Sequence, residues 1–188
     1  MSRKTTVRDS RLIDALEARS QKPFQGTIWR VVREARDQCA ASGGRWDDGS
    51  FDVLYTSQKS DGAIAEMHFH LVRGQPVFPS KVRYHLHELK GSLNAAMTLS
   101  MSDLESLGLD ASRFGQLSYN ERHQEYIRTQ EIAEVAHFLD CDGLLVPNAR
   151  WDCTNVVWFC DQLKPDALEI VHDHGIIDWT LWQTANKR

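Results

Sequence analysis

Arg45, Tyr55 and Glu66 are three polar residues whose types and spacing could act together on one ligand. Arg45 follows two glycines, which let a backbone approach a ligand closely. Tyr55 lies at the end of a β-rich segment, and Glu66 lies in the mainly apolar segment that follows it. A strand end and the first turns of the next helix can face the same cleft, so we expect the three side chains to converge.

A carboxylate, an aromatic ring and a guanidinium suit cleavage of the nicotinamide–ribose bond of NAD⁺. Nicotinamide departs as a neutral molecule, so this reaction needs no general acid, whereas most glycosidases use two carboxylates. Positive charge develops on the ribose, and one carboxylate can stabilise it. A tyrosine can stack on the nicotinamide or the ribose, and an arginine can hold the pyrophosphate with two N–H groups.

Each of the three residues also has an ordinary structural role. An arginine in a glycine-rich loop is usually solvated or paired with a nearby acid, here Asp47. A tyrosine at a strand end is usually half in the core, and a glutamate on a helix is usually exposed. The residue types alone therefore do not separate a reactive site from an ordinary surface.

The elements that would position these residues follow from the hydrophobic pattern. Strands are predicted over residues 27–32, 51–56, 81–89, 95–99, 143–146 and 155–159, with the third and fourth paired. Helices are predicted around residues 12–16 and over residues 63–71 and 122–139. A further helix should start at the capping box Ser102-Asp103-Leu104-Glu105 and end at Gly108. The apolar tail over residues 168–182 should pack back on the body.

The order of these elements favours an α+β fold. Strands and helices are mixed without the regular alternation of a doubly wound sheet, which indicates a mixed, mainly antiparallel sheet core with surrounding helices. The sequence has no Gly-x-Gly-x-x-Gly after a strand and no Walker-type lysine loop. A bound nucleotide would therefore be held by other groups.

Length and charge narrow the classes of function. The chain has 188 residues, which favours a single domain over residues 1–188. Its formal net charge is −4, which gives no broad electrostatic case for nucleic acid. No stretch approaches the ~20 apolar residues that cross a bilayer, and no apolar run follows the basic start, as a secretory signal requires. We expect a cytoplasmic protein that binds neither nucleic acid nor a membrane.

Cysteines and histidines give two further expectations. Cys39, Cys141, Cys153 and Cys160 form no Cys-x-x-Cys pair, so we expect reduced thiols. Histidine occurs in three His-x-His pairs, at positions 68 and 70, 85 and 87, and 172 and 174. His85 and His87 would share one face of a strand, but no third ligand is evident in the sequence, so we expect no metal.

Several motifs in one order carry a resemblance to a known family. The runs at residues 43–47, 53–57 and 63–66 resemble the RES domain, which is named for its Arg, Glu and Ser residues. Ile28-Trp29-Arg30 fits the strand that opens this domain. The stretch over residues 143–150 and the strand over residues 155–159 fit its later motifs, so the resemblance covers roughly residues 24–160.

The resemblance implies a fold, an activity and partners. RES proteins are toxins of type II toxin–antitoxin pairs, usually encoded with an Xre-like helix-turn-helix antitoxin, and their fold resembles ADP-ribosyltransferase toxins. Known members degrade NAD⁺ by hydrolysis or phosphorolysis, or transfer ADP-ribose to a host protein. The resemblance therefore implies an enzyme with NAD⁺ as substrate, an antitoxin partner and, for a transferase, a host protein acceptor.

The resemblance also assigns roles to particular residues. Glu66 and Arg45 match the family's glutamate and arginine, and Tyr55 matches its NAD⁺-contacting tyrosine. Arg30 is expected as a second anion contact, with Ser57 and Asn148 as further contacts to NAD⁺.

Asn148 departs from the family pattern, because it stands where the family has serine. Asparagine can still donate and accept hydrogen bonds, but it cannot copy the reach of a small hydroxyl. The departure leaves the acceptor open between water, phosphate and a protein side chain. Three functions stay open: NAD⁺ degradation, mono-ADP-ribosylation of a host protein with little bulk NAD⁺ loss, and non-catalytic nucleotide binding.

Overall fold

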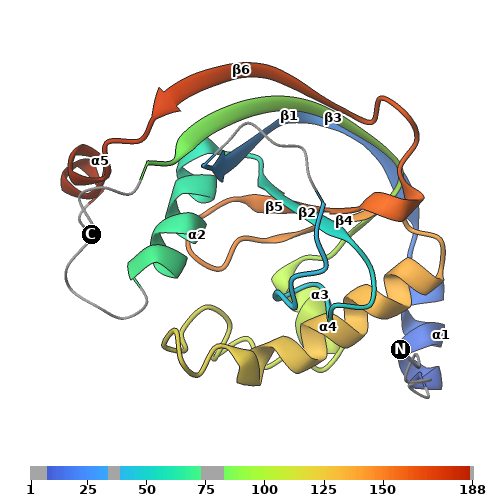
Figure 1. Ribbon diagram of the computed structural model, residues 1–188. Helices are drawn as coiled ribbons and strands as arrows, with labels where there is room; N and C mark the ends of the chain where they lie inside the picture. Colours follow the sequence, from blue (N-terminus) through green and yellow to red (C-terminus); the bar gives the residue numbers. More distant parts are fainter. Residues whose placement is uncertain (1–7, 34–38, 73–82, 187–188) are drawn as a thin grey trace.

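A six-stranded sheet forms the centre of the molecule (Figure 1). The computed structural model describes residues 8–33, 39–72 and 83–186. The strands are β1 (Gln21–Val32), β2 (Val53–Ser57), β3 (His85–Thr98), β4 (Gly143–Pro147), β5 (Thr154–Phe159) and β6 (Leu168–Ile176).

The strand order is β1-β2-β5-β4-β3-β6, and β1 also pairs with β3. Five strands therefore form a closed ring of pairings, with β6 added on β3. The β3–β4 pair is parallel and the other named pairs are antiparallel. The predicted α+β class with a mainly antiparallel sheet is confirmed.

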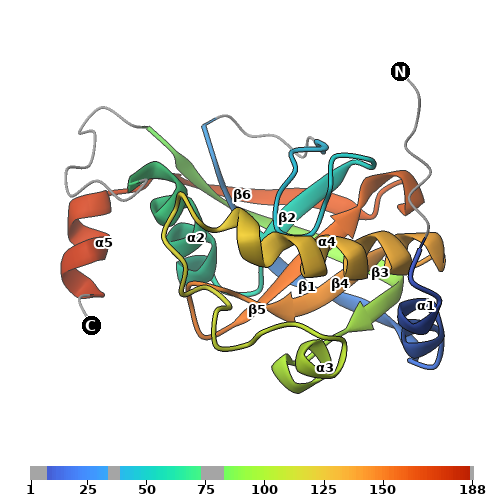
Figure 2. The same ribbon diagram turned by 90° about the horizontal axis from the view of Figure 1, so that it is seen from below.

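Helices cover the sheet and close its ends. They are α1 (Ser10–Glu17), α2 (Ser60–Val72), α3 (Met101–Ser106), α4 (His123–Phe138) and α5 (Trp179–Ala185), and a short 3₁₀ turn spans Cys160–Gln162. Figure 2 shows α4 running across the strands, with α2 and α5 at one end of the molecule and α1 at the other. In the described part of the chain, no helix has the length and apolar character that crossing a bilayer requires.

Two hydrophobic clusters lie on opposite faces of β5. Val157 and Phe159 belong to the larger cluster, which α1, α3 and α4 cover. Val156 and Trp158 belong to the second cluster, in which they meet side chains of β1 and β3. All four residues are fully buried, which explains why β5 is a continuous apolar run in the sequence. Its neighbour β2, which carries Tyr55, is thereby fixed in the middle of the fold.

The sequence pattern predicts most of these elements. The predicted helices near residues 12–16, 63–71 and 122–139 are α1, α2 and α4, and the predicted strands over residues 51–56, 143–146 and 155–159 are β2, β4 and β5. The predicted strand over residues 27–32 is the second half of the longer β1. The tail packs back on the body as expected, although its first half is the edge strand β6.

The paired strands predicted over residues 81–89 and 95–99 are a wrong prediction. Residues 81 and 82 lie outside the described residues, and residues 85–98 form one continuous strand, β3. Gly91 lies in the middle of this strand against the ring of Trp158, where a side chain would collide with the indole. Leu89 and Leu93 keep the alternation of buried residues on both sides of it, so the strand continues.

The capping box lies two residues earlier in the chain than predicted, at Ser100 and Asp103 instead of Ser102 and Glu105. Ser100 caps α3, its hydroxyl accepts from the Asp103 N–H at 3.2 Å, and the Asp103 carboxylate accepts from the Ser100 N–H at 2.8 Å. The shorter aspartate replaces the usual glutamate at this position. The helix ends before Gly108, as predicted.

Cys39 and Cys160 form a disulfide, which corrects the expectation of four reduced thiols. The two cysteines lie 121 residues apart in the sequence, so no local motif indicates the pairing. The disulfide ties the end of β5 to the segment that leads into the glycine-rich loop of Arg45. Cys141 and Cys153 are free.

Candidate active site

A cavity of about 480 Å³ brings Arg45, Tyr55 and Glu66 together. Its walls come from β1, β2, α2, the start of α4 and the loop over residues 42–46. The expected convergence of the three side chains is therefore found. Further polar residues on the walls include Arg30, Ser57, His70, Arg122, His123, Tyr126 and Asn155.

The glycine-rich loop wraps around one buried acid, Asp47. Its carboxylate is 0% exposed and accepts from the N–H groups of Gly43 at 2.6 Å and Gly44 at 3.0 Å. Gly43 has a φ of +67°, and a side chain on Gly44 would lie 2.7 Å from the Tyr55 hydroxyl. Both glycines are thus required for the loop to close over Asp47 and Tyr55.

Tyr55 is held by the same loop. Its hydroxyl donates to Asp47 at 2.7 Å and accepts from the Trp46 N–H at 2.9 Å. Burial, reinforced by the charge and hydrogen bond of Asp47, holds the pKa of Tyr55 well above its usual value. The phenol therefore stays neutral at ordinary pH, and its two hydrogen bonds fix it in the cavity wall.

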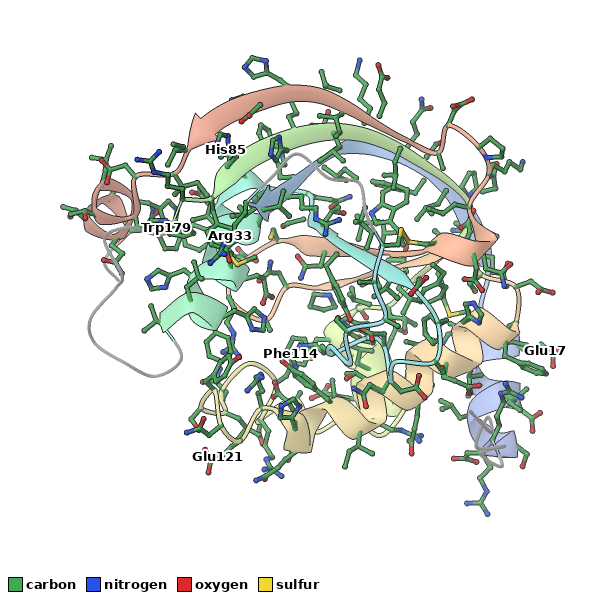
Figure 3. All side chains as sticks on the ribbon, viewed as in Figure 1. Glu17, Arg33, His85, Phe114, Glu121 and Trp179 are labelled. Carbon is green, nitrogen blue, oxygen red and sulfur yellow. A yellow bond between two sulfur atoms is a disulfide. The ribbon has the colours of Figure 1, made fainter. Side chains whose placement is uncertain are left out.

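Arg45 forms a buried ion pair with Glu125 of α4. The Arg45 Nη1 lies 2.6 Å from the Glu125 Oε1, with side-chain exposures of 9% and 2%. The guanidinium lies 4.6 Å from the ring centre of Phe114, which Figure 3 labels, and 4.9 Å from that of Tyr126. The ordinary reading of Arg45 as solvated, or paired with Asp47, is wrong, because Asp47 holds the loop and Glu125 holds the arginine.

Glu66 lies on α2 and is half-buried at the cavity wall. Its Oε1 accepts from the backbone N–H of Ala149 at 3.2 Å and from the side-chain amide of Asn155 at 3.4 Å. A carboxylate has about four acceptor positions, so these two bonds fix Glu66 and leave it able to accept from a ligand. Burial lowers the pKa of nearby Arg150, and the charge of Glu66 opposes that shift.

Asn148 is 8% exposed and is not among the residues that line the cavity. Its side-chain amide donates to Asn155 at 2.7 Å and to the Gly62 carbonyl at 3.3 Å, and its Oδ1 accepts from the Arg150 and Trp151 N–H groups at 2.7 and 2.9 Å. Asn148 was expected to contact NAD⁺ directly, but its side chain does not line the cavity. It fixes the segment that holds Glu66.

Ser57 and Arg30 both line the cavity. Ser57 is 1% exposed, and its hydroxyl lies 3.2 Å from the Cys153 sulfur. Arg30 is half-buried on β1, where it pairs in register with His87 of β3.

Glu125 is the main residue of the site that the sequence analysis misses, although a signal was present. Glu125, Thr129, Ile132 and Ala136 are spaced by four, three and four residues and form the buried stripe of α4. An acid on an otherwise uncharged stripe indicates a buried partner. Asn155 was part of a recognised motif, but nothing in the sequence connects it to Glu66.

A model of the RES domain matches residues 18–182. The chain belongs to the RES domain family. The match extends beyond residues 24–160, since it also includes β6 and much of α5. A comparison with curated proteins found no match.

Among solved structures, this RES domain is similar to one described as the crystal structure of the M. tuberculosis MbcT–MbcA toxin–antitoxin complex. The TM-score is 0.75, and the alignment covers 96% of this chain and 99% of the other. The two sequences are 20% identical, so the likeness shows a shared fold.

Proposed function

We propose that this RES domain is the toxin of a toxin–antitoxin pair and that it consumes NAD⁺ by breaking the nicotinamide–ribose bond. The observation that carries the proposal is the Glu66 carboxylate, held by neutral donors at the wall of a cavity of about 480 Å³. This volume is in the usual range for pockets that take small molecules and cofactors, about 300–1,000 Å³.

The chemistry assigned to Glu66 is electrostatic. As nicotinamide departs, the ribose carbon becomes cationic, and a fixed carboxylate stabilises this charge and accepts from the ribose hydroxyls. Glu66 suits this role because Ala149 and Asn155 hold its Oε1 without neutralising its charge. Nicotinamide leaves as a neutral molecule, so the reaction needs no general acid. The raised pKa of Tyr55, which keeps its proton in place, is consistent with this mechanism.

The pyrophosphate requires positive charge elsewhere in the same cavity. Arg45 is paired with Glu125, but a guanidinium has five N–H donors and can bind a carboxylate and a phosphate together. Arg30 and Arg122 also line the cavity and supply further positive charge. Tyr55 and Tyr126 offer aromatic rings for the nicotinamide or the ribose.

Family membership and the fold shared with a toxin–antitoxin structure support the wider assignment. A free NAD⁺ consumer would harm its own host, so we propose that an Xre-like antitoxin covers the cavity in the cytoplasm. The acceptor of the ADP-ribosyl group is water, phosphate or a host protein. Free ADP-ribose, its phosphate ester and a labelled protein band, respectively, are the products that distinguish them.

Expression of the chain without an antitoxin tests the proposal in cells. We expect growth arrest and a fall in cellular NAD⁺ with the wild type, and neither with Glu66→Gln. The matched control is Glu105→Gln, because Glu105 is an exposed glutamate on α3, away from the cavity. Full toxicity of Glu66→Gln at equal expression would overturn the proposal. If Glu66→Gln removes the growth arrest while wild-type cells keep their NAD⁺, host-protein modification replaces bulk consumption.

A further inference from the structure

His85, His87 and Asp173 meet where β6 pairs with the start of β3, the region of His85 in Figure 3. The two histidines are alternate residues on one strand, and Asp173 lies opposite His87 in register. Each residue offers one ligand atom, and these atoms all lie within 4.8 Å of one another. We propose that the three side chains bind a divalent transition-metal ion of the Zn²⁺ type, outside the cavity.

The distances fit such an ion after a small adjustment. The Asp173 carboxylate lies 2.9 Å from the His85 Nδ1 and 3.9 Å from the His87 Nδ1. With bonds of about 2.0–2.1 Å, tetrahedral zinc holds its ligand atoms roughly 3.3 Å apart. One distance is shorter and the other longer than this value. The Asp173 Oδ1 accepts from the Gly175 N–H at 2.8 Å, so equalising the two distances requires a rotation of the carboxylate, which is 45% exposed and has room for it.

His87 gives an independent indication of a ligand. The residue is 2% exposed, and both of its ring nitrogens are buried without a hydrogen-bond partner in the described part of the chain. A buried polar group without a partner is unfavourable, because it has lost its bonds to water. At 3.9 Å, Asp173 is too distant to form a hydrogen bond with His87, and an ion between them would bind both.

The surrounding strands indicate what the ion would do. The β3–β6 register shifts between His85 and His87, so regular pairing is interrupted at this point. A bound ion would join His85 and His87 of β3 to Asp173 of β6 and would thereby fix the edge strand. The rings of His85 and His87 lie at an interplanar angle of 9°, with centroids 5.9 Å apart. In both rings the Nδ1 atom lies toward Asp173, at 2.9 and 3.9 Å from its carboxylate.

The neighbouring charges set the expected strength and the ligand count. Arg30 on β1 is paired in register with His87 and adds positive charge, so we expect micromolar affinity rather than that of a closed structural site. His174 is bonded to Glu88 at 2.9 Å and is not counted as a ligand. Solvent would complete the coordination, since His85 and Asp173 are both partly exposed.

Calorimetric titration of Zn²⁺ alone into the metal-free full chain tests the proposal. We expect one ion per chain, and a Tm that rises with Zn²⁺. Loss of a group that only supports a ligand costs on the order of 10–100-fold in affinity, so removal of a ligand should cost at least about tenfold. The variants are His85→Gln and Asp173→Asn, because both side chains are partly exposed and the buried His87 stays in place.

The pair formed by His137 and Asp161 provides a matched control. Its ring nitrogen and carboxylate also lie 2.9 Å apart, with exposures of 21% and 54%, and it belongs to no three-residue group in the described residues. Asp161→Asn should bind Zn²⁺ like the wild type. Glu66→Gln should do the same, so the outcome does not depend on the proposed function.

Two results would overturn the metal site. One is the absence of Zn²⁺ binding by the wild type at millimolar concentrations. The other is wild-type affinity in Asp173→Asn or His85→Gln, which would assign the ion to other groups such as the free Cys153.

Discussion

The two charged walls of the cavity are built in opposite ways. On one wall, the positive charge of Arg45 is neutralised by Glu125, and the nearby loop is fixed by the buried Asp47. On the other wall, Glu66 is held by a backbone N–H and an amide, neither of which carries charge. Arg45 is therefore fixed by a charged partner, whereas Glu66 is fixed by neutral donors and its carboxylate stays available as a negative charge.

The largest effect is expected from removing Glu125, the partner of the buried Arg45. Glu125→Ala leaves the buried Arg45 charge without its partner, which should destabilise the fold by about 3–5 kcal/mol. Urea unfolding measures this change. The control is Glu131→Ala in the same helix, because its ion pair with Arg128 is exposed and should be worth less than about 1 kcal/mol. Equal losses in the two variants would remove the contrast between the walls.

The second prediction concerns the support of Glu66. Asn148→Ala removes the bonds that hold Asn155 and the segment of Ala149, so Glu66 should lose its fixed position. We expect kcat for nicotinamide release to fall by roughly tenfold or more, since small misplacements at a reacting centre are costly. KM should change little, because Asn148 does not line the cavity. A raised KM with unchanged kcat would instead make Asn148 a direct substrate contact.

A carboxylate outside the cavity gives the smallest expected effect. Hydrogen bonds from Ser100, and then from Arg19, lower the pKa of Asp103 from 3.8 to about 2. The folded state therefore favours the ionised form, and this stabilisation is complete above the unfolded pKa and is lost as the pH falls through about 2.

Asp103→Asn tests this pH dependence. The variant should be less stable by about 1 kcal/mol at pH 7, the usual value of a helix-capping bond, and the difference should shrink as the pH falls below 3.8 and vanish below about 2. Urea unfolding across this pH range measures it. A difference that stays constant with pH would show that the charge of Asp103 is not involved.

The sequence predicts the parts of the fold and site that depend on local patterns. The helices α1, α2 and α4 follow from apolar spacing, and the convergence of Arg45, Tyr55 and Glu66 follows from a strand end preceding a helix. The roles of these three residues remain predictions.

The parts that the sequence does not predict depend on contacts between distant residues. The Cys39–Cys160 disulfide spans 121 residues, and the Arg45–Glu125 pair joins a loop to a helix far along the chain. The continuity of β3 depends on the Trp158 ring, which occupies the space beside Gly91. Likewise, Asp173 becomes a neighbour of His87 only because β6 pairs with β3.

The most direct test of the central claim separates binding from chemistry in the purified protein. The dissociation constant of NAD⁺ and the rate of nicotinamide release are measured for the wild type and for Glu66→Gln. An electrostatic role predicts a rate at least about 100-fold lower, with NAD⁺ binding nearly unchanged. Nicotinamide release by Glu66→Gln at the wild-type rate would contradict the account.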